Sequence, residues 1–151
     1  MGYNILSYRI EKKVKEGITG GERVYFDFMI DNVSLSEILN INEWGMIGAL
    51  LKATPTTYTY SLEKLEELMF KRKSILQNER VLMYGCVECL DIGCGAITAE
   101  MNRLNEQVTW KAFAYENGYE ATDFEEYHKV GPFEFEASQY FETLERLKKE
   151  M

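Results

Sequence analysis

The chain has few of the side chains that carry out most enzyme chemistry, with one histidine and three cysteines among 151 residues. The single histidine, His128, removes most routes to histidine-assisted nucleophilic catalysis. Its neighbours Tyr127 and Lys129, in an acidic segment, predict a solvent-exposed ring. No glycine-rich segment follows a strand and opens a helix with phosphate-cradling spacing. These absences favour a non-enzymatic protein.

Long apolar runs and an excess of basic residues are also lacking. The run Trp44 to Leu51 is far shorter than the ~18 residues that a membrane span needs, and the N-terminal residues predict no secretory signal. The chain has 25 acidic and 17 basic residues, a net charge of −8, which opposes attraction to phosphate backbones and anionic lipid. We expect no nucleic-acid and no membrane partner. An odd cysteine number fits a reducing compartment, so a cytoplasmic location is favoured.

Apolar material, in contrast, is plentiful. Hydrophobic residues make up 46% of the chain and aromatic residues 13%, which is enough to form a core without a metal or disulfide. A chain of this length is in the single-domain range. We therefore expect one globular domain over residues 1–151, with no cofactor.

Hydrophobic periodicity predicts the secondary structure. Period-two alternation over 6–10 and 24–30, across a glycine-rich loop, is typical of an antiparallel hairpin. A helix is predicted to start at Leu35, with Ser34 and Glu37 as a capping box, and another to run from a Ser61 cap to Leu76. Further strands are expected at 81–84, 96–101, 108–115 and 133–135, before a C-terminal helix that carries Tyr140, Phe141, Leu144 and Leu147.

Strands and helices are segregated along the chain, which predicts the α+β class. We expect a mostly antiparallel, twisted sheet, with two or three helices packed mainly on one face. Asp27 and Asp31 lie on one face of their predicted strand, opposite its apolar residues, and are expected to face water. Their alternative role is to line a cleft as an acid and base pair.

The densest group of reactive side chains contains Cys86, Cys89 and Cys94. Its favoured interpretation is a tight loop whose buried thiols pack as small apolar groups. One alternative is a zinc site formed by these three cysteines with His128 or Asp91 as the fourth ligand. Another is a disulfide or a thiol redox role, although Glu88 beside the cluster disfavours a reactive thiolate.

An acidic, aromatic-rich segment carries most of the net charge. Between Glu116 and Glu136 there are seven acidic residues and one lysine, a local charge of −6. A solvated loop is the simpler interpretation, but exposed aromatic residues among charges are typical of interfaces. The residues predicted to bind a partner are Glu120, Asp123, Phe124, Glu125, Glu126 and Tyr127.

From Tyr84 to about Leu144 the chain resembles a family of small, functionally uncharacterised bacterial proteins. The resemblance is carried by the Cys/Gly-rich turn Cys89–Gly95, by Trp110-Lys111-Ala112-Phe113, and by Pro132-Phe133-Glu134-Phe135 followed by Tyr140. It implies a shared fold unit and no catalytic residue. The aromatic residues of these motifs are expected to be core and helix-docking groups.

These patterns lead to one functional hypothesis and its alternatives. We expect a cytoplasmic, non-enzymatic binding protein whose acidic surface recognises a basic protein, as small acidic inhibitor or immunity-like proteins do. The alternative is a cysteine-cluster protein that binds zinc or acts in thiol redox chemistry. Homodimerisation, through a sheet edge or the apolar patch Trp44 to Leu51, is a third possibility.

Overall fold

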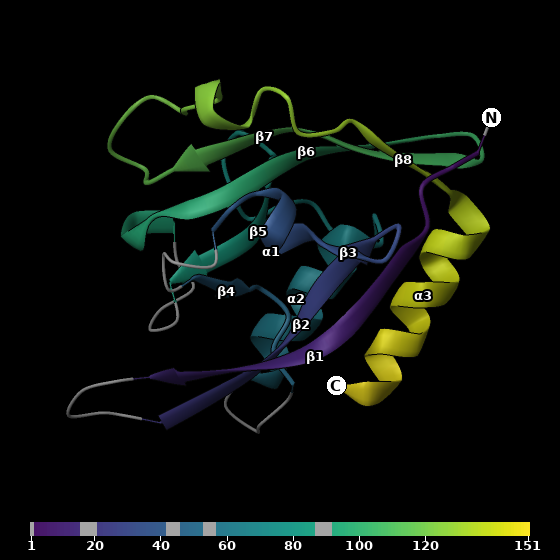
Figure 1. Cartoon of the computed structure of the whole chain (residues 1–151), viewed down its shortest axis with the longest axis horizontal. Coiled ribbons are helices and arrows are strands. Elements are labelled where there is room, and N and C mark those ends of the chain that lie inside the picture. Colours follow the sequence, from purple (N-terminus) through teal and green to yellow (C-terminus); the bar gives the residue numbers. More distant parts are fainter. Residues whose placement is uncertain (1, 16–20, 42–45, 53–56, 87–91) are drawn as a thin grey trace.

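The computed structural model describes residues 2–15, 21–41, 46–52, 57–86 and 92–151 (Figure 1). Its strands form two antiparallel sheets, one of three strands and one of five. Three α-helices accompany them in the described part of the chain. The α+β class is therefore confirmed, although the strands divide between two sheets.

The smaller sheet begins with the predicted hairpin. Strands β1 (Leu6–Lys15) and β2 (Gly21–Ile30) pair antiparallel along their whole length, and β3 (Val33–Ser34) returns along the end of β2. The loop 16–20 between β1 and β2 is outside the described residues. Strand β2 also exchanges backbone hydrogen bonds with the segment after β4, from Phe26 N to Leu50 O and from Lys52 N to Val24 O, both 2.9 Å. These bonds connect the two sheets.

The larger sheet runs in the order β4-β5-β6-β7-β8. Its strands are β4 (Met46–Gly48), β5 (Val81–Cys86), β6 (Ala96–Leu104), β7 (Gln107–Glu116) and β8 (Phe133–Glu136). Each strand after β4 lies near its predicted position. Two short 3-10 helices, η2 (Ile92–Cys94) and η3 (Glu125–Tyr127), lie in the connections that follow β5 and β7.

Helix α3 (Ala137–Glu150) closes the core at one end of the two sheets (Figure 1). It presents Tyr140, Leu144 and Leu147, all fully buried. Trp110 of β7 packs edge-to-face on Phe28, Phe135 and Tyr140, with ring centroids 5.2, 5.1 and 5.9 Å apart. The Tyr140 hydroxyl accepts a hydrogen bond from Trp110 Nε1 and donates one to Leu68 O. Trp110, Phe135 and Tyr140 are therefore core and helix-docking groups, as expected.

Helix α1 (Leu35–Ile38) begins at the predicted residue, but the capping box is wrong. Ser34 makes no side-chain capping bond; its hydroxyl instead donates to the Asp27 carboxylate at 2.5 Å. A hydroxyl that donates to a buried carboxylate makes a charge-assisted hydrogen bond, which is stronger than one between neutral groups. The Ser34 side chain thus links β3 to Asp27 of β2 and does not cap α1.

Helix α2 (Tyr58–Leu68) differs from the prediction at both ends. Ser61 does not cap it; the Ser61 hydroxyl lies inside the helix and accepts a hydrogen bond from Leu51 N at 3.0 Å. The helix ends before Leu76 because Phe70 adopts a left-handed conformation, with φ 60. Hydrogen bonds from Phe70 N to Glu67 O and from Lys71 N to Glu66 O complete a Schellman motif.

The apolar patch proposed for homodimerisation is largely internal. Ile47, Leu50 and Leu51 are buried, each at most 4% exposed, and Trp44 is outside the described residues. The prediction of a surface patch over this run is therefore wrong for its described part, because the segment packs against β2. Among the described residues, no helix has the length and apolar character that crossing a membrane would require.

Candidate functional site

The predicted partner-binding residues lie on the connection between β7 and β8. Six of its residues form what we call the acidic-aromatic surface, and all six are exposed: Tyr119, Glu120, Asp123, Phe124, Glu125 and Glu126. The two aromatic rings are unusually accessible, with Tyr119 84% and Phe124 45% exposed. The structure thus brings five of the six predicted residues onto one connection and adds Tyr119.

Tyr127, the sixth predicted residue, does not belong to this surface. It is 3% exposed and joins the hydrophobic core, so its prediction as a partner-binding residue is wrong. Burial raises the pKa of its phenol above the ordinary value, with Glu126 and Asp123 adding to the effect. Tyr127 therefore anchors η3 to the core, and this leaves the residues before it facing solvent.

Local hydrogen bonds hold the backbone of this connection. Asn117 Oδ1 accepts from the backbone N of Tyr119 and Glu120, at 2.9 and 3.0 Å. Asp123 and Tyr115 exchange two backbone hydrogen bonds of 2.9 Å, which extends pairing beyond β7. Asp123 Oδ1 also accepts from Glu125 N at 3.0 Å. The charged side chains are therefore carried by an ordered backbone.

Glu116, at the base of the connection, is buried and is not part of the surface charge. One carboxylate oxygen accepts from Arg80 Nε at 3.2 Å and from the Thr98 hydroxyl. The other accepts from Asn78 Nδ2 at 2.7 Å and from Thr122 at 3.2 Å. Burial lowers the pKa of the Arg80 guanidinium, and Glu116 opposes that effect. The connection is thus tied to the sheet by a fully satisfied ion pair.

Sequence reasoning did not identify Arg80. Its guanidinium also donates to the backbone oxygens of Thr98 and Ala112. Its carbon Cζ lies 5.0 Å from the centre of the Phe124 ring, a cation–π distance. The only signal in the sequence was an isolated arginine before a predicted apolar strand, which is not specific. Arg80 positions Phe124 and neutralises Glu116 at the same time.

The four surface carboxylates have no counterion of their own in the described structure. Salt bridges are found for other exposed acids, such as Glu100 with Lys111 at 3.4 Å and Glu145 with Lys71 at 3.7 Å. None of the described cationic groups lies within ion-pair distance of Glu120, Asp123, Glu125 or Glu126. The surface is therefore electrostatically unbalanced.

The cysteine segment is only partly described, because Cys89 and Asp91 are outside the described residues. Cys94 ends η2, is exposed and is disulfide-bonded, whereas Cys86 at the end of β5 is half-buried and is not in a disulfide. The prediction of buried, free thiols is therefore wrong for Cys94. A disulfide sulfur does not bind zinc as a thiolate does, so a zinc site that includes Cys94 would first require reduction.

His128 is exposed, as predicted. Its Nδ1 lies 2.6 Å from the backbone oxygen of Glu125, within the 3-10 turn, so this nitrogen is engaged in local structure. No group of three or more potential metal ligands occurs among the described residues.

The prediction that Asp27 faces water is also wrong, because Asp27 is 1% exposed. Its carboxylate accepts from Tyr84 of β5 at 2.5 Å and from Ser34 and Ser36 at 2.5 and 3.1 Å. Asp31, at the end of the strand, accepts instead from Asn4 and from Ile5 N. The two aspartates are thus in separate environments and do not form an acid and base pair. Asp27 joins the two sheets.

No protein-family model, curated protein or solved structure matches this chain.

Proposed function

We propose that the protein is a non-enzymatic binding protein that docks a basic protein on its acidic-aromatic surface, as small acidic inhibitor or immunity-like proteins do. The observation that carries this proposal is the set of four exposed carboxylates without counterions, arranged around two exposed aromatic rings. Opposite charge on a partner would restore the balance and guide its approach. The rings would supply the apolar contacts that hold the complex.

The order of the connection supports this proposal further. Binding costs less conformational entropy when the contacting residues are already held in place. Here the pairing of Asp123 with Tyr115, the Asn117 turn and the buried anchors Glu116 and Tyr127 hold the backbone. A solvated loop that served solubility alone would not need such anchoring.

The net charge of −8 also bears on the alternatives. It opposes binding to nucleic acid and to anionic membrane surfaces, and we propose that the protein acts in the cytoplasm. Homodimerisation remains a weaker proposal: the described residues of the Trp44 to Leu51 run are largely buried and offer little surface for it, which leaves a sheet edge as the route.

The test starts from a random peptide display library panned on the native protein. We expect the selected peptides to be rich in lysine and arginine and to contain apolar residues. Affinity is then measured by calorimetry for a synthetic selected peptide. Two variants are compared: E120K/D123K/E125K/E126K, and the control E100K/E106K/E142K/E145K. The control residues are all exposed, and both variants have the same net charge.

If the proposal is correct, the surface variant loses affinity by at least about a hundredfold, because several charge pairs are replaced by repulsion. The control variant loses much less. Equal losses in the two variants would show that only net charge matters, and selected peptides without basic residues would contradict the proposal directly.

A specific observation favours thiol exchange over zinc as the second candidate function. Cys94 is disulfide-bonded, and Cys86 in the same short segment carries a thiol outside that disulfide. A Cys86 thiolate that attacks this disulfide forms a new sulfur–sulfur bond and releases one sulfur as a thiolate, so no external oxidant is needed. Mass spectrometry of peptides after thiol alkylation, with and without a small dithiol, tests for two interconverting disulfide pairings. A single pairing under all conditions would rule out this exchange.

A further inference from the structure

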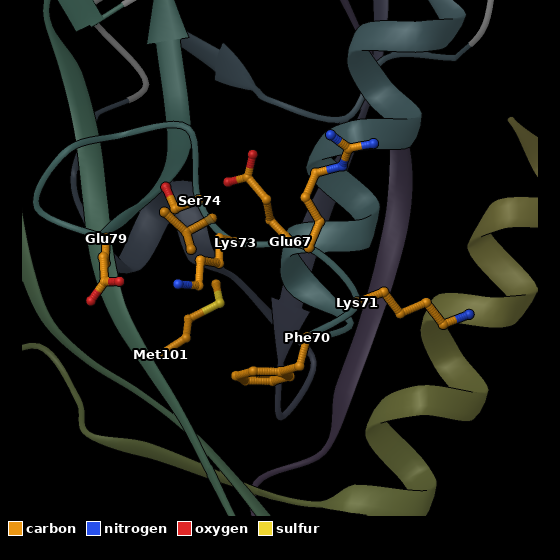
Figure 2. A pocket seen from close by; sticks show the side chains of 9 residues that line it. Glu67, Phe70, Lys71, Lys73, Ser74, Glu79 and Met101 are labelled. Carbon is orange, nitrogen blue, oxygen red and sulfur yellow. The ribbon is translucent and has the colours of Figure 1, made fainter.

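A pocket of about 380 Å³ opens where helix α2 ends, away from the acidic-aromatic surface residues. Glu67 of α2, Val81 of β5 and Met101 of β6 line it, together with the segment Phe70–Ser74 and Glu79. The left-handed conformation of Phe70 turns this segment sharply after the helix. Figure 2 shows the Phe70 ring and the Met101 side chain at one end of the pocket, and the Glu67 carboxylate at the other.

Glu67 is the unusual member of this lining. Its side chain is 3% exposed, and its Oε2 lies 3.6 Å from Nζ of Lys64, one helical turn earlier. Its other oxygen, Oε1, is buried and has no hydrogen-bond partner in the described structure. A buried carboxylate oxygen without a donor is costly. Oε1 has almost no accessible surface, so a ligand in the pocket reaches it when the Glu67 side chain turns toward the pocket, and the ligand then supplies the missing donor.

Lys73 offers the opposite charge. Its ammonium group extends into the pocket in Figure 2, whereas Lys71 points away toward α3. Lys71 is paired with Glu145 at 3.7 Å and Arg72 with Glu66 at 3.2 Å. Lys73 forms no such pair with the described residues. Glu79 also lines the pocket but forms no ion pair with Lys73. The pocket therefore contains a buried acceptor that lacks a donor, an exposed cation that is not ion-paired with a described residue, and apolar side chains beside them.

We propose that this pocket binds a small zwitterion, an α-amino acid with an apolar side chain. Its ammonium group donates to Glu67 Oε1, its carboxylate pairs with Lys73, and its side chain packs on Phe70 and Met101. The volume is within the range of small-molecule sites. This binding does not depend on the acidic-aromatic surface, so it is a further property of the protein.

The experiment is calorimetric titration of the full chain with L-leucine, L-methionine and L-phenylalanine. At least one is expected to bind with one site per chain. For leucine, two analogues separate the charges: isoamylamine lacks the carboxylate and isocaproate lacks the amine. Each analogue is expected to bind at least about tenfold more weakly than leucine, because each loses one charged hydrogen bond. If the site is occupied only by water, none of these compounds produces a binding isotherm, and the proposal is overturned.

Matched variants locate the site. Lys73→Gln is expected to weaken amino-acid binding at least about tenfold, whereas Lys149→Gln, at an exposed position of α3 that does not line the pocket, leaves it unchanged. Glu67→Gln is expected to weaken it similarly, and Glu63→Gln on the same helix serves as its control. Should Glu67→Gln fail to fold, the comparison of Lys73→Gln with its lysine control still tests the proposal, because both lysines are exposed. Equal affinities for Lys73→Gln and Lys149→Gln would overturn the proposal, and E120K/D123K/E125K/E126K should retain amino-acid binding.

Discussion

Arg80 and Glu116 form a buried ion pair of 3.2 Å that fastens the acidic connection to the larger sheet. Both side chains are at most 10% exposed, and every oxygen of the carboxylate has a donor. The acidic-aromatic surface is therefore the exposed part of a connection whose base is internal. Its order depends on this pair.

Arg80→Ala is expected to lower the free energy of unfolding by about 3 kcal/mol or more, because it leaves the Glu116 charge buried without a cation. Urea unfolding followed by circular dichroism measures the change. Lys111→Ala is the control, since its ion pair with Glu100 is about half exposed and such pairs contribute less than about 1 kcal/mol. Similar losses for the two variants would show that the buried pair has no special role.

Tyr84→Phe is expected to cost about 1–3 kcal/mol, because removal of the hydroxyl leaves one oxygen of the buried Asp27 without its donor. The same urea unfolding measurement applies. Tyr119→Phe removes a hydroxyl from a ring that is 84% exposed and should change stability by no more than about 0.5 kcal/mol. A Tyr84→Phe protein as stable as the native one would contradict the view that this hydrogen bond joins the sheets.

Alkaline pH is expected to destabilise the protein in a defined window. Burial raises the pKa of Tyr25 to about 12 and raises that of Tyr84 well above its usual value. In both cases the folded chain keeps a proton that the unfolded chain loses above pH ~10, so stability is full below that pH and falls as pH rises toward 12. Each such tyrosine lowers the free energy of unfolding by about 1.4 kcal/mol per pH unit in this window.

Urea midpoints at a series of pH values, together with phenolate absorbance, test this expectation. Tyr119→Phe again serves as the control, because its ring is 84% exposed and its substitution leaves the buried phenols in place. A constant urea midpoint up to pH 12 would contradict the burial of these phenols.

The cysteines provide a chemical test of the oxidised segment. Alkylation of the native protein without reductant should label Cys86, which is not in a disulfide, and leave Cys94 unlabelled because it is disulfide-bonded. After reduction both should be labelled. Peptide mass spectrometry reads the result. Labelling of Cys94 before reduction would show that the disulfide does not form in solution, and would restore the zinc hypothesis for these cysteines and His128.

Local patterns predicted most of the secondary structure, because strands such as β1, β2 and β7 have regular alternation or apolar runs. The end of α2 could not be predicted in this way. Its left-handed residue is Phe70, whereas a glycine is the usual signal for such a helix end. The division of the strands into two sheets was not predicted either, because local patterns do not show which strands pair with one another.

The candidate site was predictable in composition but not in detail. The run of acids and aromatic residues was visible in the sequence, yet burial separates its members. Tyr127 and Glu116 are internal, and Phe124 is exposed. Strand alternation predicts that Asp27 faces water. The prediction fails because the donors that make its burial possible, Tyr84 and Ser36, come from other elements. Long-range contacts determine which polar residues are buried, and hydropathy patterns do not record them.

The central claim, that the acidic-aromatic surface binds a basic partner, is tested most directly by mapping where such a partner sits. The measurement is the change in backbone amide NMR shifts when a selected lysine- and arginine-rich peptide is added to the labelled native protein. The account predicts that the largest changes fall on Tyr119, Glu120 and residues 123–126, and that they vanish in E120K/D123K/E125K/E126K. Largest changes on α3 or on the β1–β2 hairpin, with residues 119–126 unaffected, would contradict it.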